Sequence, residues 1–383
     1  MKTSIKLVLL SLIISLSCNA NSEKKLSLNE ISTPLTKHEP VKNQFIKVAI
    51  LLDTSNSMDG LIDQAKAQLW EIVNELSYAR CNDNKPNLLI SIYEYGNDNL
   101  NSGEGYIRQV LAFSNDLDEI SKELFSLTTN GGNEYCGKVI QTSLNQLDWG
   151  KNKDDLKLIF IAGNEPFTQG RINYKDAATN ANEKEVTINT IFCGDYYTGI
   201  STQWKDGADL TNGDYIAINH NHKTVHIPSP YDDKILQLNK RLNSTYVAYG
   251  SSGSKKMQLQ KEQDDNAQGY SEANAVSRTV SKSSHLYKNS SWDLVDAVEL
   301  EEVVITELKE EALPDELKNK SASEIKKYIE NKKKERNAIQ AQIQELNTKR
   351  KVYISKQEKN NGLESAMIKA IKTQAINKNY KWE

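Results

Sequence analysis

Cysteine is scarce in this chain of 383 residues, which holds only four. A fold held together by several disulfides, as in many small exported domains, is therefore excluded. No apolar run reaches the roughly 20 residues that a membrane-spanning helix needs. The chain has 48 Lys and Arg residues against 51 Asp and Glu residues, so it carries no overall positive charge that would attract nucleic acid. The sequence also lacks a phosphate-binding Gly-rich loop and a Gly-x-Ser-x-Gly elbow, so a non-enzymatic role is favoured.

The first residues have the pattern of an export signal. Lys2 and Lys6 precede an apolar run from Leu7 to Leu16, which is followed by small and polar residues. Residues 1–17 are predicted to be a signal peptide, and Cys18 resembles the lipidated cysteine of bacterial lipoproteins. Residues 18–44 would then form a polar tether that places the protein in the cell envelope, attached to a membrane only by its lipid. Ordinary signal cleavage after Ala20 is the alternative.

Residues 45–250 alternate between two kinds of apolar pattern. Continuous apolar runs rich in β-branched residues predict strands that are buried on both faces, and three-four spacing predicts amphipathic helices. The predicted strands are 45–52, 88–95, 106–113, 156–162, 186–192 and 215–218, and the main predicted helices are 60–79, 117–127, 138–149 and 231–242. This order favours an α/β fold with a doubly wound, mostly parallel sheet. The turn-rich loop 96–105 adds one antiparallel edge strand.

The remainder of the chain is predicted to be helical. Residues 251–320 are interpreted as a linker with a weak helical segment, and residues 321–383 as a helix or coiled coil with a basic tail. Ser321 and Glu324 fit a capping box, which marks the start of a helix. The apolar seam that follows is interrupted by Arg336 and Arg350. Packing within the chain is therefore favoured over self-association as a coiled coil.

The turn Asp53-Thr54-Ser55-Asn56-Ser57 lies directly after the first predicted strand. Ligands of parallel sheets bind at the carboxyl ends of the strands. Asp53, Ser55 and Ser57 occupy alternate positions, so a carboxylate and two hydroxyls can point toward one hard divalent cation. The alternative is a serine-rich helix N-cap, with Asp53 accepting hydrogen bonds from backbone N–H groups.

With this turn, the chain from Val48-Ala49-Ile50-Leu51-Leu52-Asp53 to Asp209-Leu210-Thr211-Asn212-Gly213-Asp214-Tyr215 resembles the von Willebrand factor A family. The resemblance covers about half of the chain. It implies a metal-ion-dependent adhesion site (MIDAS), in which the Asp-x-Ser-x-Ser turn holds Mg²⁺ or Ca²⁺ and a carboxylate of a protein partner completes the coordination. It also implies a binding module rather than an enzyme.

The family's two other metal-binding segments match less closely. Its threonine falls on or near Asn133, with Thr129 as a second choice, and its aspartate falls on Gly163, so that Asn164 or Glu165 would have to reach in. The predicted metal ligands are Asp53, Ser55, Ser57, Asn133 and Glu165.

Two further clusters call for interpretation. Cys136 and Cys193 both fall near the carboxyl edge of the predicted sheet, so a disulfide between them is expected, with two free thiols as the alternative. His220, His222 and His226 could in principle bind zinc, but their Asn-rich surroundings favour a turn.

Two functions are therefore considered. The first is an exported, lipid-anchored module that recruits a protein partner, with a divalent ion at a partly degenerate MIDAS-like site. The second is a metal-independent scaffold of the cell envelope that acts through its C-terminal helices.

Overall fold

Strand β1 (Phe45–Asp53) lies inside a six-stranded sheet because its side chains are apolar on both faces. In this computed structural model, which describes residues 44–219, 227–356 and 363–383, the strand order is β4-β3-β1-β5-β6-β7. All neighbouring strands are parallel except the edge pair β3 and β4. The other strands are β3 (Asn87–Tyr95), β4 (Ile107–Ser114), β5 (Leu156–Gly163), β6 (Thr187–Cys193) and β7 (Tyr215–Ile218). The predicted fold class is confirmed.

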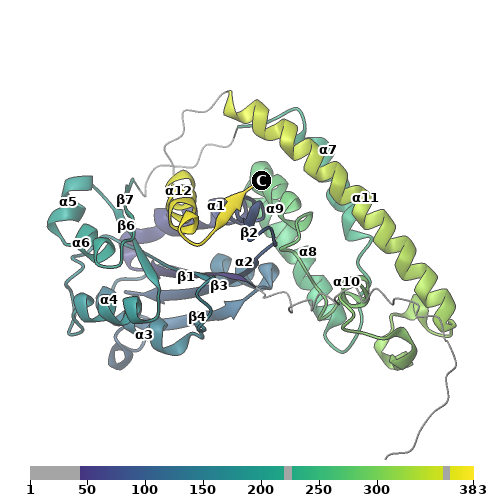
Figure 1. Ribbon diagram of the computed structural model, residues 1–383, viewed down its shortest axis with the longest axis horizontal. Helices are drawn as coiled ribbons and strands as arrows, with labels where there is room; N and C mark the ends of the chain where they lie inside the picture. Colours follow the sequence, from purple (N-terminus) through teal and green to yellow (C-terminus); the bar gives the residue numbers. More distant parts are fainter. Residues whose placement is uncertain (1–43, 220–226, 357–362) are drawn as a thin grey trace, which may run out of the picture. The chain divides into compact units, whose positions relative to one another are not determined.

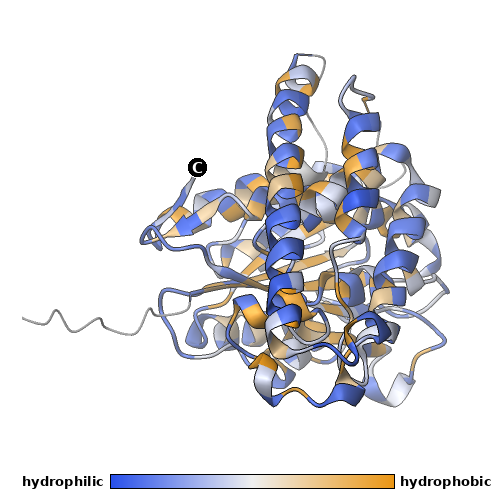
Figure 2. Ribbon diagram, turned by 90° about the vertical axis from the view of Figure 1, so that its right-hand side faces the viewer, coloured by the Kyte–Doolittle hydropathy of each residue, from blue (hydrophilic) through white to orange (hydrophobic). Residues whose placement is uncertain are grey.

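Helices cover both faces of the sheet (Figure 1). Alternate residues of β1 point to opposite faces. Ala49 and Leu51 face α3 (Cys136–Gln146), α4 (Tyr174–Glu183) and α6 (Trp204–Asp209), whereas Ile46 and Val48 face α1 (Asp59–Leu76), α2 (Leu117–Ser126), α9 (Glu272–Lys282) and α12 (Leu363–Ile376). Figure 2 shows hydrophobic strands behind helices whose outward faces are mainly hydrophilic.

The remaining elements connect or cover these layers. They are β2 (Ala79–Cys81), α5 (Tyr196–Ser201), α7 (Asp232–Asn243), α8 (Gly253–Tyr270), α10 (Leu294–Glu299), α11 (Ala322–Ser355), β8 (Tyr380–Trp382) and the 3₁₀ helices η1 (Asn56–Met58), η2 (Ser102–Glu104), η3 (Ile305–Glu307), η4 (Glu310–Ala312) and η5 (Asp315–Leu317). Strand β8 pairs antiparallel with β2, so the last described residues lie beside an early part of the chain.

The C-terminal helices share the core of the sheet domain. Val276 and Val280 of α9 and Ile339 and Ile343 of α11 belong to the same buried cluster as β1. The predicted capping box starts α11, with Ser321 and Glu324 bonded to each other's backbone. Because α11 buries its apolar seam against α7 and α9, this seam packs within the chain.

The charged residues that interrupt the seam of α11 form buried ion pairs. Arg336 Nη1 lies 2.7 Å from a carboxylate oxygen of Asp293, and Arg350 Nε lies 3.1 Å from one of Asp232. A buried guanidinium is stable only where carboxylates and hydrogen-bond acceptors replace its water. The two arginines are therefore part of the helix interface and do not mark its exposed side.

Several predictions concern segments outside the described residues. These are the signal peptide at 1–17, the lipidation of Cys18, nearly all of the tether, and the cluster His220, His222 and His226. Within the part of the chain that the structure describes, no helix is both long and apolar enough to cross a bilayer.

Candidate functional site

Asp53 ends β1 at the carboxyl edge of the sheet, where loops from neighbouring strands meet. The parallel register places Tyr95, the last residue of β3, beside Asp53. The Asp53 Oδ1 atom accepts a hydrogen bond of 2.8 Å from the Ser55 N–H, and Ser55 precedes the 3₁₀ turn η1. One carboxylate oxygen therefore acts as a local cap, as the N-cap interpretation expected. The other carboxylate oxygen, Asp53 Oδ2, accepts no hydrogen bond from the described residues.

Three buried oxygens at this edge have no hydrogen-bond partner among the described residues. They are Asp53 Oδ2, Ser55 Oγ and Asn164 Oδ1. Asp53 is fully buried and Ser55 is almost so. An unpaired buried polar atom costs roughly 1–3 kcal/mol, so each such group calls for a partner such as an ion, a ligand or an ordered water. All three are oxygens, which are the ligands that hard divalent cations prefer.

The second loop brings Glu134 toward Asp53 and leaves Asn133 outside. Asn133 is exposed, whereas Glu134 is buried. The Glu134 Cγ atom and the Asp53 Oδ1 atom lie 2.7 and 2.9 Å from the position that a Cβ on Gly96 would take. Thr129, the second predicted choice, donates its hydroxyl hydrogen bond to Asp59 instead. The loop therefore offers the site a carboxylate where an amide or hydroxyl oxygen was expected.

Tyr95 explains why residue 163 is a glycine. A Cβ at Gly163 would lie 2.6 Å from the Tyr95 hydroxyl, closer than real Cβ atoms approach, and 3.0 Å from Asp53 Oδ2, which is a tight contact. The hydroxyl is held there by a hydrogen bond of 2.9 Å to the Ala162 carbonyl. An aspartate at position 163 would collide with Tyr95. The packing of Tyr95 therefore accounts for the absence of the family's aspartate at this position.

The residues after Gly163 turn back toward the Asp53 loop. Asn164 Nδ2 donates a hydrogen bond of 3.1 Å to Ser57 Oγ, which fixes the side chain at the exposed edge of the site. Glu165 is half-buried, and its backbone carbonyl accepts a hydrogen bond of 2.8 Å from the Trp204 indole. The structure thus places Asp53, Ser55, Ser57, Asn164 and Glu165 at one edge of the sheet.

The carboxyl groups of Asp53, Glu134 and Glu165 repel one another when they are ionised. Burial raises the pKa of Asp53 to about 7, the Ser55 N–H opposes this rise, and the charges of Glu134 and Glu165 add to it. Burial likewise raises the pKa of Glu134 to about 7, and the charges of Glu165 and Asp98 add to this rise. Ionised carboxylates at such a site call for a compensating cation.

In EDTA, the chain is expected to become more stable as the pH falls from 8 to 6. Both raised pKa values mean that the folded state binds more protons than the unfolded state between pH about 4 and 7, so stability decreases as the pH rises through this window. For Asp53 the gain from pH 8 to 6 should be about 1–2 kcal/mol. Urea unfolding at pH 6, 7 and 8 measures it. Asp53→Asn should flatten the profile, and an unchanged slope in this variant would contradict the assignment.

The expected disulfide between Cys136 and Cys193 is absent, because both are free, buried thiols. The Cys136 sulfur lies 3.8 Å from the Tyr95 hydroxyl, so it is engaged with the ring that fills this edge. Burial raises the pKa of both thiols, which makes them poor nucleophiles.

Across residues 44–219, 227–356 and 363–383, no three His, Cys, Asp or Glu side chains form a ready-made metal cage. A site that uses serine and asparagine oxygens beside Asp53 does not need one. The three unpaired oxygens and the surrounding carboxylates fit a hard divalent ion, with Asp53, Ser55, Ser57, Glu134 and Asn164 as the residues within the site.

Residues 47–203 match the family model of the von Willebrand factor type A domain. This stretch is a von Willebrand factor type A domain. Such domains commonly mediate interactions between proteins. The matched stretch includes every residue gathered at the candidate site, from Asp53 to Glu165. A search of curated proteins finds no match to this chain.

Solved structures that are similar to the VWA domain share little sequence with it. BatB from Bacteroides thetaiotaomicron, a conserved hypothetical protein, is 16% identical over 45% of this chain and 90% of that chain, with a TM-score of 0.35. The SpRpn10 VWA domain is 18% identical over 45% and 87%, with a TM-score of 0.34. An aerotolerance-related membrane protein from Bacteroides fragilis NCTC 9343 is 16% identical over 46% and 93%, with a TM-score of 0.31.

Proposed function

We propose that this chain is an exported module that binds a protein partner through a divalent ion at the Asp53 edge of its VWA domain. The observation that carries the proposal is the set of unpaired buried oxygens on Asp53, Ser55 and Asn164. Asp53, Ser55 and Ser57 would hold Mg²⁺ or Ca²⁺ together with Glu134, which takes the place predicted for Asn133. The ion would supply a positive charge that attracts a carboxylate of the partner.

The packing of the C-terminal helices favours this proposal over a scaffold that acts through those helices. The apolar seam of α11 is buried against α7 and α9, and α9 lies against α1. The apolar seam that α11 buries in this way is therefore not available to hold a second protein. The carboxyl edge of the sheet, in contrast, presents unsatisfied polar atoms. Binding at the sheet edge therefore agrees better with the chemistry of the surface.

Thermal melting of the full chain after EDTA treatment, with and without added Mg²⁺ or Ca²⁺, tests the proposal. At an ion concentration of 100 times Kd, the expected stabilisation is about 2.7 kcal/mol. Asp53→Ala should abolish the shift, and it should not lower stability without the ion, since it removes a buried carboxyl whose pKa is raised. Asp209→Ala, which changes an exposed residue paired with Lys205, is the matched control and should keep the shift. If neither ion raises the melting temperature of the unmutated chain, the proposed binding of a divalent ion is refuted.

A further inference from the structure

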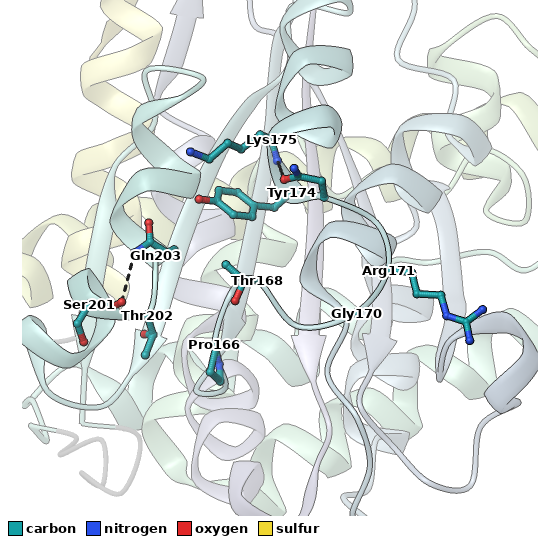
Figure 3. A pocket seen from close by; sticks show the side chains of 10 residues that line it. Pro166, Thr168, Gly170, Arg171, Tyr174, Lys175, Ser201, Thr202 and Gln203 are labelled. Carbon is teal, nitrogen blue, oxygen red and sulfur yellow. Dashed lines mark hydrogen bonds between the residues drawn. The ribbon is translucent and has the colours of Figure 1, made fainter.

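A polar groove opens beside the candidate site. Its volume is about 800 Å³, within the range of pockets that hold small ligands. One wall is the loop between β5 and α4 together with the first turn of α4, and the other is formed by Ser201 at the end of α5 and the two residues that precede α6 (Figure 3). Pro166 at the start of the groove directly follows Glu165 of the candidate site. The groove therefore continues the surface on which Asp53 lies.

Tyr174, which lines the groove, belongs to a buried aromatic cluster. The Phe167 ring packs edge-on against Tyr174 at 5.3 Å and against Trp204 at 4.9 Å between ring centroids. The Phe167 N–H donates a hydrogen bond of 3.0 Å to the Thr202 carbonyl, which joins the two walls. Because the walls are fixed before a partner arrives, binding would cost little ordering entropy.

Among the residues that line the groove, positive charge exceeds negative charge, although Asp206 beside the groove balances Lys175. Among its lining residues, Arg171 and Lys175 are cations and none is a carboxylate. Lys175 shares the Asp206 carboxylate with the Tyr174 hydroxyl, at 3.4 and 2.5 Å respectively. Arg171 is exposed and has no ion pair or hydrogen bond within the described part of the chain. In Figure 3 its guanidinium extends away from the other labelled side chains.

Exposed apolar side chains lie next to the residues of both walls in the sequence. Ile172 follows Arg171 on one wall, and Ile200 precedes the other wall, both with more than a third of their surface exposed. Tyr197 on α5 is 76% exposed. Exposed apolar groups beside charged donors are typical of surfaces that bind other proteins.

We propose that this groove binds an extended, acidic segment of the partner protein, with one carboxylate directed to the Asp53 site. The inference rests on the proposed function and specifies the chemistry of the partner. Arg171 and Lys175 supply the attraction for acidic side chains. Near Asp53, the carboxylates of Glu134 and Glu165 repel such a segment unless a divalent ion neutralises them. Binding should therefore require both the groove cations and the ion.

Fluorescence anisotropy with a defined probe tests this inference. The probe is a fluorescein-labelled peptide of alternating Asp and Ser, compared with an Asn-Ser peptide of equal length, both titrated with the full chain in Mg²⁺ or Ca²⁺. The acidic peptide should bind at least tenfold more tightly. The double variant Arg171→Glu with Lys175→Glu should weaken its binding at least tenfold and keep the ion-dependent melting shift. The double variant Lys151→Glu with Lys153→Glu, at two exposed lysines outside the groove, makes the same change in net charge and is the control.

The outcomes distinguish peptide binding in the groove from ion binding at the Asp53 site. Equal binding of both peptides, no binding of the acidic peptide at millimolar concentration, or full binding by the double variant would each overturn the groove proposal. Loss of binding in the double variant with a preserved ion shift supports it. If Asp53→Ala binds the acidic peptide as tightly as the unmutated chain, the proposed ion-dependent function fails. Groove binding by charge would then stand alone.

Discussion

A chain that ends at Gly250 is expected to lose cooperative folding, although it contains the whole six-stranded sheet. Truncation removes side chains that are buried in the core beside α1, on α9, α11 and α12. They include Val276, Val280, Ile339, Ile343 and Ile371. At about 1.5–3 kcal/mol for each buried aliphatic side chain, the loss is on the order of 10 kcal/mol. This equals the whole stability of a typical domain.

Urea unfolding followed by circular dichroism, together with binding of an apolar dye, measures this loss. The truncated chain should unfold without a sharp transition and should bind the dye strongly. A chain that ends at Ser355 lacks only α12 and β8, and should be intermediate. Removal of Glu383 alone, which loses an ion pair of 3.0 Å with Arg80, is the control and should be almost neutral. A sharp transition at the full-length midpoint in the chain ending at Gly250 would show that the sheet domain is independent.

Arg336→Met is expected to cost about 3–5 kcal/mol of unfolding free energy, because it leaves two buried carboxylates without their cation. Arg336 Nη1 lies 2.7 Å from Asp293 and 2.5 Å from Asp296, and its other nitrogens donate to Thr245. Asp293 is fully buried. Methionine keeps the length of the aliphatic part, so most of the loss comes from charge. Urea unfolding at pH 7.5 measures it.

Acidification should reduce this loss. Burial, and the neighbouring charge of Asp293, raise the pKa of Asp296 to about 6 even with Arg336 present. Without the arginine, the folded state should bind a proton still more readily, so the variant gains stability relative to the unmutated chain as the pH falls toward 5. Lys333→Met removes an exposed pair with Glu299 on the same helix and should cost less than 1 kcal/mol. If Arg336→Met and Lys333→Met lost equal amounts of unfolding free energy, the buried ion pairs of Arg336 would not contribute to stability as expected.

The fold could be predicted from the sequence because its four central strands are buried on both faces. The segment 45–52 carries an unbroken apolar run, and the turn at Asp53 follows it directly. The C-terminal region was harder to predict, since α9 is buried through residues such as Asn274, Ser277 and Arg278 that usually indicate an exposed surface. The partners of Asn274 and Ser277 lie about 200 residues away in α1, where no local pattern reveals them.

The candidate site was predictable only where its residues are neighbours in sequence. Asp53, Ser55 and Ser57 lie in one turn, and their spacing alone indicates a site. Glu134 was missed because Asn133 occupies the position that the family resemblance selects, although Glu134 is the next residue. Tyr95 was also missed, and it could have been found from the strand register, since two adjacent parallel strands end at Asp53 and Tyr95. Side-chain direction within a loop is set by packing that the sequence does not show.

The pairing of β8 with β2 decides how this protein can be attached to a surface. The Tyr380 hydroxyl donates a hydrogen bond of 3.3 Å to the Phe45 carbonyl, so the beginning of β1 and the last described residues meet. Asp53 lies at the other end of the same strand, roughly 26 Å away for nine residues in extended conformation. A label or immobilising tag joined at Phe45 or after Glu383 would therefore leave the Asp53 edge of the sheet accessible.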